Sequence, residues 1–162
     1  MTGTIDNLAR KVFTDPVHFL AFGFGTGLAP KAPGTFGTLP ALALFWLLRD
    51  LPLAVHLAIA SAAFVVGIYL CGESARRLGV HDYGGIVWDE IVAMYITLLV
   101  APPTVPGWLA AFVLFRFFDI VKPWPIRDLD HRLGGGLGIM LDDLVAALYA
   151  AVLLGIYGWL VT

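Results

Sequence analysis

Residues 51–72 read LPLAVHLAIASAAFVVGIYLCG, a stretch of 22 residues without Asp, Glu, Lys or Arg. As an α-helix that rises about 1.5 Å per residue, it would extend roughly 33 Å, close to the thickness of the hydrocarbon core of a bilayer. Two further stretches also lack charge, residues 91–115 and 144–162. This distribution predicts helices that cross a membrane.

The composition of the chain supports this interpretation. The 162 residues are 59% hydrophobic and 14% charged, and the mean hydropathy is +0.85. Soluble domains carry about 25% charged residues, so a freely diffusing monomer is not expected and disorder is excluded. The net charge of −2 offers no basic field for nucleic acid, and the single cysteine, Cys71, cannot form a disulfide framework. We expect one domain over residues 1–162, with a polar N-terminal segment at 1–15.

Proline and glycine divide the apolar sequence into separate elements. The segment 101–107, APPTVPG, predicts a turn inside the middle uncharged stretch. Upstream, residues 16–30 are uncharged and rich in glycine, but neither they nor 36–48 are long enough to span a bilayer alone. The expected fold class is all-α: a polytopic membrane helical bundle of four to five helices plus a broken or re-entrant N-terminal segment. The expected helices cover about 36–48, 54–72, 86–100, 107–121 and 144–161.

The charges of the loops predict an orientation for this bundle. When the loops alternate between the two sides, one side holds nine of the ten Lys and Arg residues and eleven of the twelve Asp and Glu residues. Loops rich in Lys and Arg remain in the cytoplasm. The sequence therefore predicts a multi-pass membrane protein with its charged face in the cytoplasm.

Carboxylates mark the ends of three predicted helices on that same side. Asp89 and Glu90 begin the third helix, Asp119 ends the fourth, and Asp142 and Asp143 precede the fifth. Carboxylates grouped in this way repel one another unless a hard cation such as Mg²⁺ binds among them. Stabilisation of helix N-termini is the alternative, but it does not explain Asp119 at a C-terminal end. Neighbouring acids point about 100° apart on a helix, so we expect one ligand from each adjacent pair.

Groups that can bind an anion flank these acids. Arg116 and Lys122 lie three residues before and after Asp119, so we expect all three on one face of the helix. Two segments are rich in glycine, residues 23–38, which include Lys31, and residues 134–138. Glycine would let backbone N–H groups there approach a phosphate. Intrahelical ion pairing and glycine hinges are the alternatives for these features.

Four motifs in this sequence are similar to those of a known family. They are GLAPKAPGTFGTL at 27–39, VHDYGGIVWDE at 80–90, FRFFDIVKPWPIR at 115–127 and GGLGIMLDDLVA at 135–146. Together they resemble, in order and spacing, the bacterial phosphatidylglycerophosphatase A family, and the resemblance covers about residues 16–150. Two departures, at Ala93 and at Ala146-Ala147, add methyl groups where many members have glycine, and they remove no ligand.

The resemblance implies an all-helical, Mg²⁺-dependent lipid phosphatase of the bacterial inner membrane. Such an enzyme converts phosphatidylglycerophosphate into phosphatidylglycerol and phosphate in phospholipid biosynthesis. It implies that the catalytic and metal-binding acids are Asp89, Glu90, Asp119, Asp142 and Asp143. It further implies that the substrate phosphate is bound by Lys31, Gly34, Thr35, Arg116, Lys122 and Arg127.

The sequence leaves several questions open. We favour attack by a metal-activated water with a site carboxylate as base, and a phospho-aspartate or attack by Thr35 are the alternatives. His81 is a candidate acid for the leaving alkoxide, or a histidine of a surface loop. A small transporter and a non-catalytic membrane scaffold with a cytoplasmic cation site are the alternative functions. The expected partners are the lipid substrate and the membrane lipid. We expect no nucleic-acid partner, and homo-oligomerisation stays open.

Overall fold

A computed structural model describes residues 2–81, 83–124, 126 and 134–161. The described residues form α-helices and one 3₁₀ helix, η1, and contain no β-strand. This confirms the all-α prediction. In chain order the elements are α1 (Thr2–Thr14), α2 (Pro16–Ala21), η1 (Gly23–Leu28), α3 (Pro33–Gly37), α4 (Leu39–Leu48), α5 (Leu53–Leu78), α6 (Trp88–Leu98), α7 (Val105–Val121) and α9 (Gly135–Val161).

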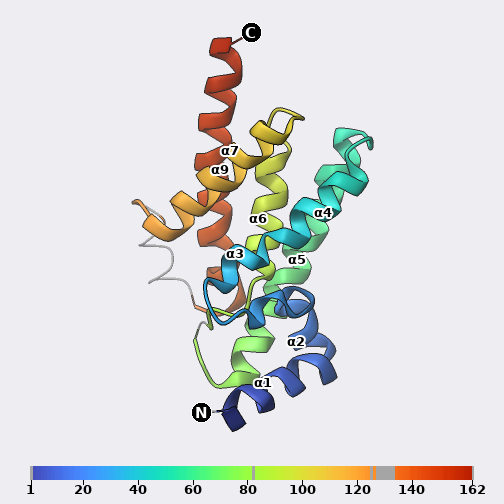
Figure 1. Ribbon diagram of the computed structural model, residues 1–162, viewed down its shortest axis with the longest axis vertical. Helices are drawn as coiled ribbons and strands as arrows, with labels where there is room; N and C mark the ends of the chain where they lie inside the picture. The colour runs from blue at the N-terminus through green and yellow to red at the C-terminus, as the bar shows by residue number, and fades with distance from the viewer. Residues whose placement is uncertain (1, 82, 125, 127–133, 162) are drawn as a thin grey trace.

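Helix α6 forms the centre of the structure. It packs against α4, α5, α7 and α9, which surround it in Figure 1. Met94 and Leu98 are almost completely buried in the resulting core, and so are Ala93 and Ala147, where many family members have glycine. Packing on four sides fixes the depth and rotation of the acidic residues at the N-terminus of this helix.

Two of the described helices are long and apolar enough to cross a membrane. They are Leu53–Leu78 and Gly135–Trp159, and a shorter apolar segment runs over Pro33–Leu48. The helices expected at 54–72, 86–100 and 107–121 are present as α5, α6 and α7. The 11 residues of α6 are too few to cross the hydrocarbon core alone. A bundle with four or five crossings therefore stays a prediction.

The start of the last helix differs from the sequence prediction. We expected it near residue 144, but α9 begins at Gly135, so Asp142 and Asp143 lie about two turns inside it. The reason is close packing against α5: a Cβ on Gly136 would overlap the carbonyl oxygen of Ile68 and lie 2.8 Å from the nitrogen of Gly72. These glycines continue the helix along α5. Because the helix dipole acts within the first turn, it does not explain these two acids.

Residues 16–37 are broken into short elements, as predicted, whereas the polar segment before them forms the 13-residue helix α1. Within η1, positive φ angles occur at three consecutive residues, Gly23, Phe24 and Gly25. The chain changes direction at this kink. Pro33 and Pro40 stand in the first turns of α3 and α4, where a missing N–H is tolerated. Whether this segment re-enters a membrane remains a prediction.

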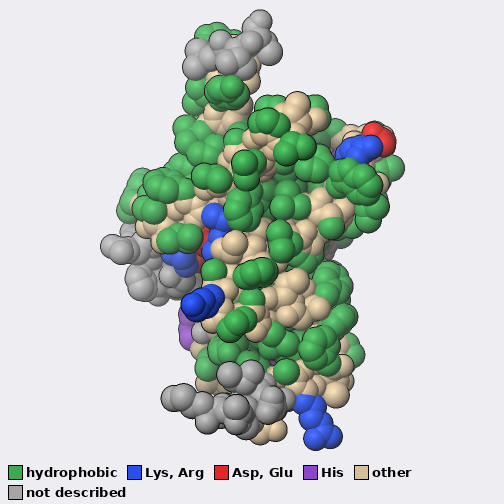
Figure 2. All heavy atoms as spheres, in the orientation of Figure 1, with side chains coloured by type: hydrophobic (Ala, Val, Ile, Leu, Met, Phe, Trp, Pro, Cys, Tyr) green, Lys and Arg blue, Asp and Glu red, His purple; other side chains and the backbone are tan. Residues whose placement is uncertain are grey.

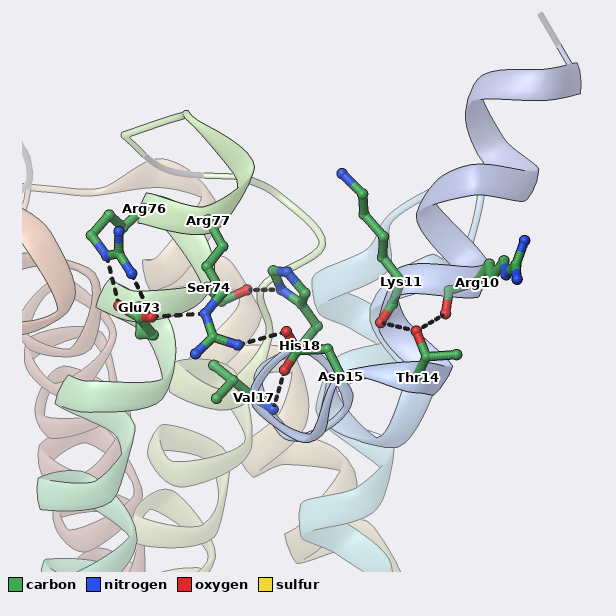
Figure 3. A network of polar contacts seen from close by, with 10 residues as sticks. All are labelled: Arg10, Lys11, Thr14, Asp15, Val17, His18, Glu73, Ser74, Arg76 and Arg77. Carbon is green, nitrogen blue, oxygen red and sulfur yellow. Dashed lines mark hydrogen bonds and ion pairs between the residues drawn. The ribbon is translucent and has the colours of Figure 1, made fainter.

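A polar network attaches α1 and α2 to the end of α5 (Figure 3). Asp15 accepts a hydrogen bond from the backbone N–H of Val17 and pairs with Arg77 at 2.6 Å. Arg77 also binds Glu73 at 2.7 Å, and the Nδ1 of His18 lies 2.8 Å from the hydroxyl of Ser74. These contacts give the arginine a structural role in helix docking.

Candidate active site

Three carboxylates from two helices form the centre of the candidate site. Asp89 and Glu90 lie in the first turn of α6, and Asp143 reaches them from α9. Each of the three side chains has one carboxylate oxygen that lies within 4.8 Å of the corresponding oxygens of the other two. The hydrogen bond from Trp88 Nε1 to the carbonyl of Ala63, at 3.0 Å, fastens the start of α6 to α5 and so positions two of the acids.

Two carboxylate oxygens at this centre lack hydrogen-bond partners. Oε2 of Glu90 and Oδ2 of Asp143 are buried and accept no hydrogen bond from the described residues. The exposed fractions are 13% for the Glu90 side chain and 4% for Asp143. Buried carboxylates without partners are unfavourable, whereas all-oxygen ligands are what Mg²⁺ prefers. The residues present therefore fit a hard divalent cation.

Arg116 of α7 borders the carboxylate group. Its Nη1 lies 2.5 Å from Oδ2 of Asp119 and 3.7 Å from Oε1 of Glu90. Its Nε makes no hydrogen bond with the described residues. The guanidinium thus combines a position fixed by Asp119 with a donor that has no partner there, and a guanidinium suits contact with phosphate oxygens.

Lys122 caps the C-terminal end of α7 in a left-handed conformation, with φ 45°. Its backbone N–H still donates to the carbonyl of Phe118, as in the helix. Its Nζ lies 2.6 Å from Oδ2 of Asp142 on α9, so its ion pair is with another helix and not with Asp119. That Arg116, Asp119 and Lys122 share one helix face stays a prediction.

The five predicted acids consequently occupy different positions. Asp89, Glu90 and Asp143 form the central group, while Asp119 faces Arg116 and Asp142 faces Lys122. The adjacent acids of α9 divide as expected, with one in the central group. The adjacent acids of α6 do not, because both contribute an atom to it.

The predicted phosphate-side loop meets the site at Gly34. A Cβ on this residue would overlap Oε1 of Glu90 and lie 2.9 Å from Nη1 of Arg116, so glycine permits the chain to lie directly on this ion pair. Thr35 is half-buried, and its carbonyl accepts a hydrogen bond from Thr38. Lys31 is exposed.

Of the two remaining predicted residues, one lies in an exposed loop and the other is outside the described residues. His81 is exposed in the loop before α6, with Nε2 3.6 Å from the position of a Cβ on Gly134. Arg127 falls outside the described residues. The contacts that the sequence did not reveal are the Lys122–Asp142 pair and the packing of Gly34 on Glu90, since both depend on how separate helices meet.

Comparisons with known proteins agree with this arrangement of motifs. The family model described as phosphatidylglycerophosphatase A matches residues 19–157. The protein "Phosphatidylglycerophosphatase A" of Escherichia coli is 44% identical over 151 residues, covering 93% of this chain and 88% of its own. The protein of the same name from Haemophilus influenzae is 47% identical over 152 residues, covering 92% and 93%.

A more distant relative carries a different name. A Bacteroides thetaiotaomicron protein named as a candidate phosphatidylinositol-3-phosphatase is 37% identical over 148 residues, covering 86% of this chain and 91% of its own. No solved structure matches the chain at a significant level. The family model covers most of the sequence and all four motifs quoted above. The chain therefore belongs to the phosphatidylglycerophosphatase A family.

Proposed function

We propose that this protein hydrolyses the terminal phosphate monoester of phosphatidylglycerophosphate, with Mg²⁺ as cofactor, and releases phosphatidylglycerol and phosphate. Membership of the family supports the class of activity, a lipid phosphatase of phosphatidylglycerol synthesis. The observation that carries the remainder is the pair of buried, unpartnered oxygens on Glu90 and Asp143 near Arg116, whose Nε also has no partner among the described residues. A cation and a phosphate together would satisfy both sets of atoms.

The central carboxylates are proposed to hold the cation. Asp89, Glu90 and Asp143 offer oxygen atoms from two helices that are fixed by packing. When bound, Mg²⁺ supplies positive charge for the phosphoryl oxygens and makes a nearby water more acidic. Asp119 and Asp142 are proposed to act from the edge, by orienting Arg116 and Lys122 toward the substrate.

Arg116 is proposed as the main phosphate ligand. Transfer of a phosphoryl group spreads negative charge over its oxygens, and fixed cations stabilise that charge. The ion pair with Asp119 holds the guanidinium in place before substrate binds. We propose that Lys122, Lys31, Thr35 and Arg127 complete this side of the site, and that His81 is a candidate acid for the leaving alkoxide.

The proposed reaction is direct attack by water. A bond forms between the water oxygen and phosphorus, the bond from phosphorus to the glycerol oxygen breaks, and a site carboxylate accepts the water proton while the leaving alkoxide gains one. A substrate chiral at phosphorus tests this step. Inversion of configuration is the expected result, and retention would indicate a covalent phospho-enzyme on an aspartate or Thr35.

A phosphate-release assay tests the function as a whole. The purified protein in detergent is assayed with Mg²⁺ or EDTA on phosphatidylglycerophosphate, phosphatidic acid, lysophosphatidic acid and phosphatidylinositol 3-phosphate, the last because of the Bacteroides relative. We expect Mg²⁺-dependent release with the highest kcat/KM on phosphatidylglycerophosphate. Release that persists in EDTA would contradict the metal proposal, and preference for another lipid would contradict the substrate.

We further propose a multi-pass location in the bacterial cytoplasmic membrane, with the site on the cytoplasmic side. The asymmetry of Lys and Arg between the two sides supports this orientation. The two long apolar helices support membrane insertion. Phosphatidylglycerophosphate would then be reached from the inner leaflet.

A further inference from the structure

An apolar groove runs along the surface between α4 and α7. Both helices pack against α6, and in Figure 1 they diverge above α3 with α6 visible between them. The groove has a volume of about 380 Å³. Its walls are apolar side chains of the two helices, namely Leu39, Leu42, Val105, Trp108, Leu109 and Phe112.

The α7 wall of this groove leads to the candidate active site. Val105, Leu109 and Phe112 line the groove, and Arg116 follows at the next position of the same series. The spacings of four, three and four residues place all four on one stripe of the helix. A molecule whose charged end contacts Arg116 can therefore extend its apolar part along this stripe.

The opposite wall begins at the same site. Leu39, at the first turn of α4, follows five residues after Gly34, which lies on the Glu90–Arg116 pair. Figure 2 shows Lys, Arg, Asp and Glu side chains gathered at the left of the molecule at mid-height, beside a largely apolar surface. The charged end and the apolar walls are thus parts of one continuous surface.

The chemistry of the groove matches a hydrocarbon chain. Val105 and Leu109 are 81% and 60% exposed, and Leu39 is 47% exposed, which is costly in water and favourable against acyl chains. An apolar groove whose α7 wall leads to the cation of Arg116 matches the two parts of a phospholipid, an apolar chain and an anionic head group.

We propose that the α4–α7 groove binds one acyl chain of the lipid substrate and so holds the head group against Arg116. This inference rests on the proposed phosphatase function and adds a binding site for the apolar part of the substrate. The groove would make the enzyme prefer a lipid over the same head group in soluble form. It would also align the long axis of the substrate with α7.

A bulky substitution in the groove tests the proposal. Leu109→Trp would fill the channel, and Val65→Trp is the matched control, since Val65 is a comparably exposed residue of α5, at 65%, outside the groove. Each variant is assayed on phosphatidylglycerophosphate in mixed micelles and on glycerophosphoglycerophosphate, which has the same head group without acyl chains. Leu109→Trp should lower kcat/KM for the lipid about tenfold or more. Its kcat/KM for the soluble head group, and both values for Val65→Trp, should stay within about twofold of wild type.

The outcomes separate the groove from the chemistry. If wild-type protein releases phosphate from neither compound, the proposed function fails. If it hydrolyses the lipid but Leu109→Trp has no effect, or lowers both activities equally, the groove proposal is wrong. A loss of lipid activity in Leu44→Trp alone would move the chain to the hollow on the other side of α4, which Leu44 lines, and would also overturn the proposal.

A second measurement is independent of turnover. Phosphatidylglycerol with a photoreactive group in one acyl chain is irradiated with the wild-type protein, and the labelled peptides are identified by mass spectrometry. We expect labelling of residues 105–112 that unlabelled phosphatidylglycerol suppresses and phosphatidylcholine does not. Labelling that both lipids suppress equally would show ordinary lipid contact and contradict a specific acyl site.

Discussion

Asp142 and Asp143 are neighbours in the sequence, but their side chains contact different residues. Asp143 joins Asp89 and Glu90 in the central group, whereas Asp142 binds Lys122 at 2.6 Å. The helix turns by about 100° between the two residues, so one carboxylate faces α6 and the other faces the end of α7. Their chemical roles are set by this rotation, because the two side chains are identical.

Replacing Asp143 with Asn should abolish Mg²⁺-dependent phosphate release. The amide retains the size of the side chain but removes the negative charge, so we expect kcat to fall about 100-fold or more. Asp50→Asn is the matched control, since that carboxylate is 91% exposed and pairs only loosely with Arg49 at 3.8 Å. Phosphate release at saturating Mg²⁺ is the measurement. Wild-type activity in Asp143→Asn would contradict the acidic site.

Gly34→Ala should damage the site while leaving the fold intact. The added methyl group would displace Glu90 and Arg116, and small displacements of catalytic groups are costly, so we expect kcat/KM to fall about tenfold or more. Gly84→Ala is the control, because a Cβ there meets no atom within 4 Å. Kinetics and thermal unfolding are measured together. Equal activity of the two variants would show that Gly34 is not in contact with functional groups.

At the scale of elements, the close approach of α5 and α9 decides where the acids point. Gly136 lies against the backbone of α5 at Ile68 and Gly72, and this crossing fixes both the height and the rotation of α9. Met140 continues the contact, with its sulfur 3.8 Å from the sulfur of Cys71. The glycine-rich segment that the sequence suggested for phosphate thus also serves helix packing.

Gly136→Ala should lower stability. A methyl group in this crossing forces the helices apart, and such overpacking costs about 1–3 kcal/mol. Gly155→Ala in the same helix is the control, because its Cβ would meet only Val100, at 3.9 Å, and alanine favours the helix. The unfolding temperature in detergent is compared for both. A drop in Gly155→Ala equal to that in Gly136→Ala would contradict the close crossing.

The docking of α1 and α2 on α5 should weaken as the pH falls below about 6.5. Burial lowers the pKa of His18, while Asp15 opposes that effect and Arg77 and Lys11 reinforce it. The unfolded segment therefore takes up a proton before the folded one, and stability is lost as the pH falls from the unfolded pKa toward the folded one. Asp15 remains ionised in this range: burial opposes ionisation, but hydrogen bonds from Arg77 and Val17 leave its pKa below the usual value.

Hydrogen exchange of residues 2–21 at pH 7.5 and pH 5.5, corrected for the intrinsic rate, measures this effect. We expect greater opening at the lower pH in the wild type and a smaller change in His18→Gln, which keeps a polar group near Ser74. An identical pH dependence in the variant would assign the effect to another group. Glu73, the remaining acid of the network, is not a candidate, because hydrogen bonds from Arg76 and Arg77 lower its pKa to about 2.

At the scale of the whole molecule, charge and apolar surface occupy separate regions. The central acids, Arg116 and Lys122 lie together at one level, and Arg49 and Asp50 lie in the turn after α4. Figure 2 shows a largely apolar surface between the charged group at mid-height and the pair at the upper right. This distribution suits a protein in which the apolar surface between the two charged groups is immersed in lipid.

Labelling of single cysteines tests the proposed orientation. In a Cys71→Ala background, an impermeant maleimide applied to intact cells should label Asp50→Cys but not Lys31→Cys, both of which are exposed positions. Lys31→Cys should react only after the membrane is opened. The reverse pattern would place the active site outside the cytoplasm and contradict the orientation drawn from Lys and Arg.

The sequence by itself determined the helical class, the approximate helices between residues 36 and 121, and the five acids and Arg116, which the structure brings close to one another. Long uncharged stretches allow few other structures, and the proline-containing segment 101–104 separates α6 from α7, which begins at Val105. It could not determine which acids share the central group, because that depends on helix rotation. The tertiary structure decided this through contacts between distant segments, namely Gly136 against α5, Gly34 against Glu90, and Lys122 leaving α7 to meet Asp142.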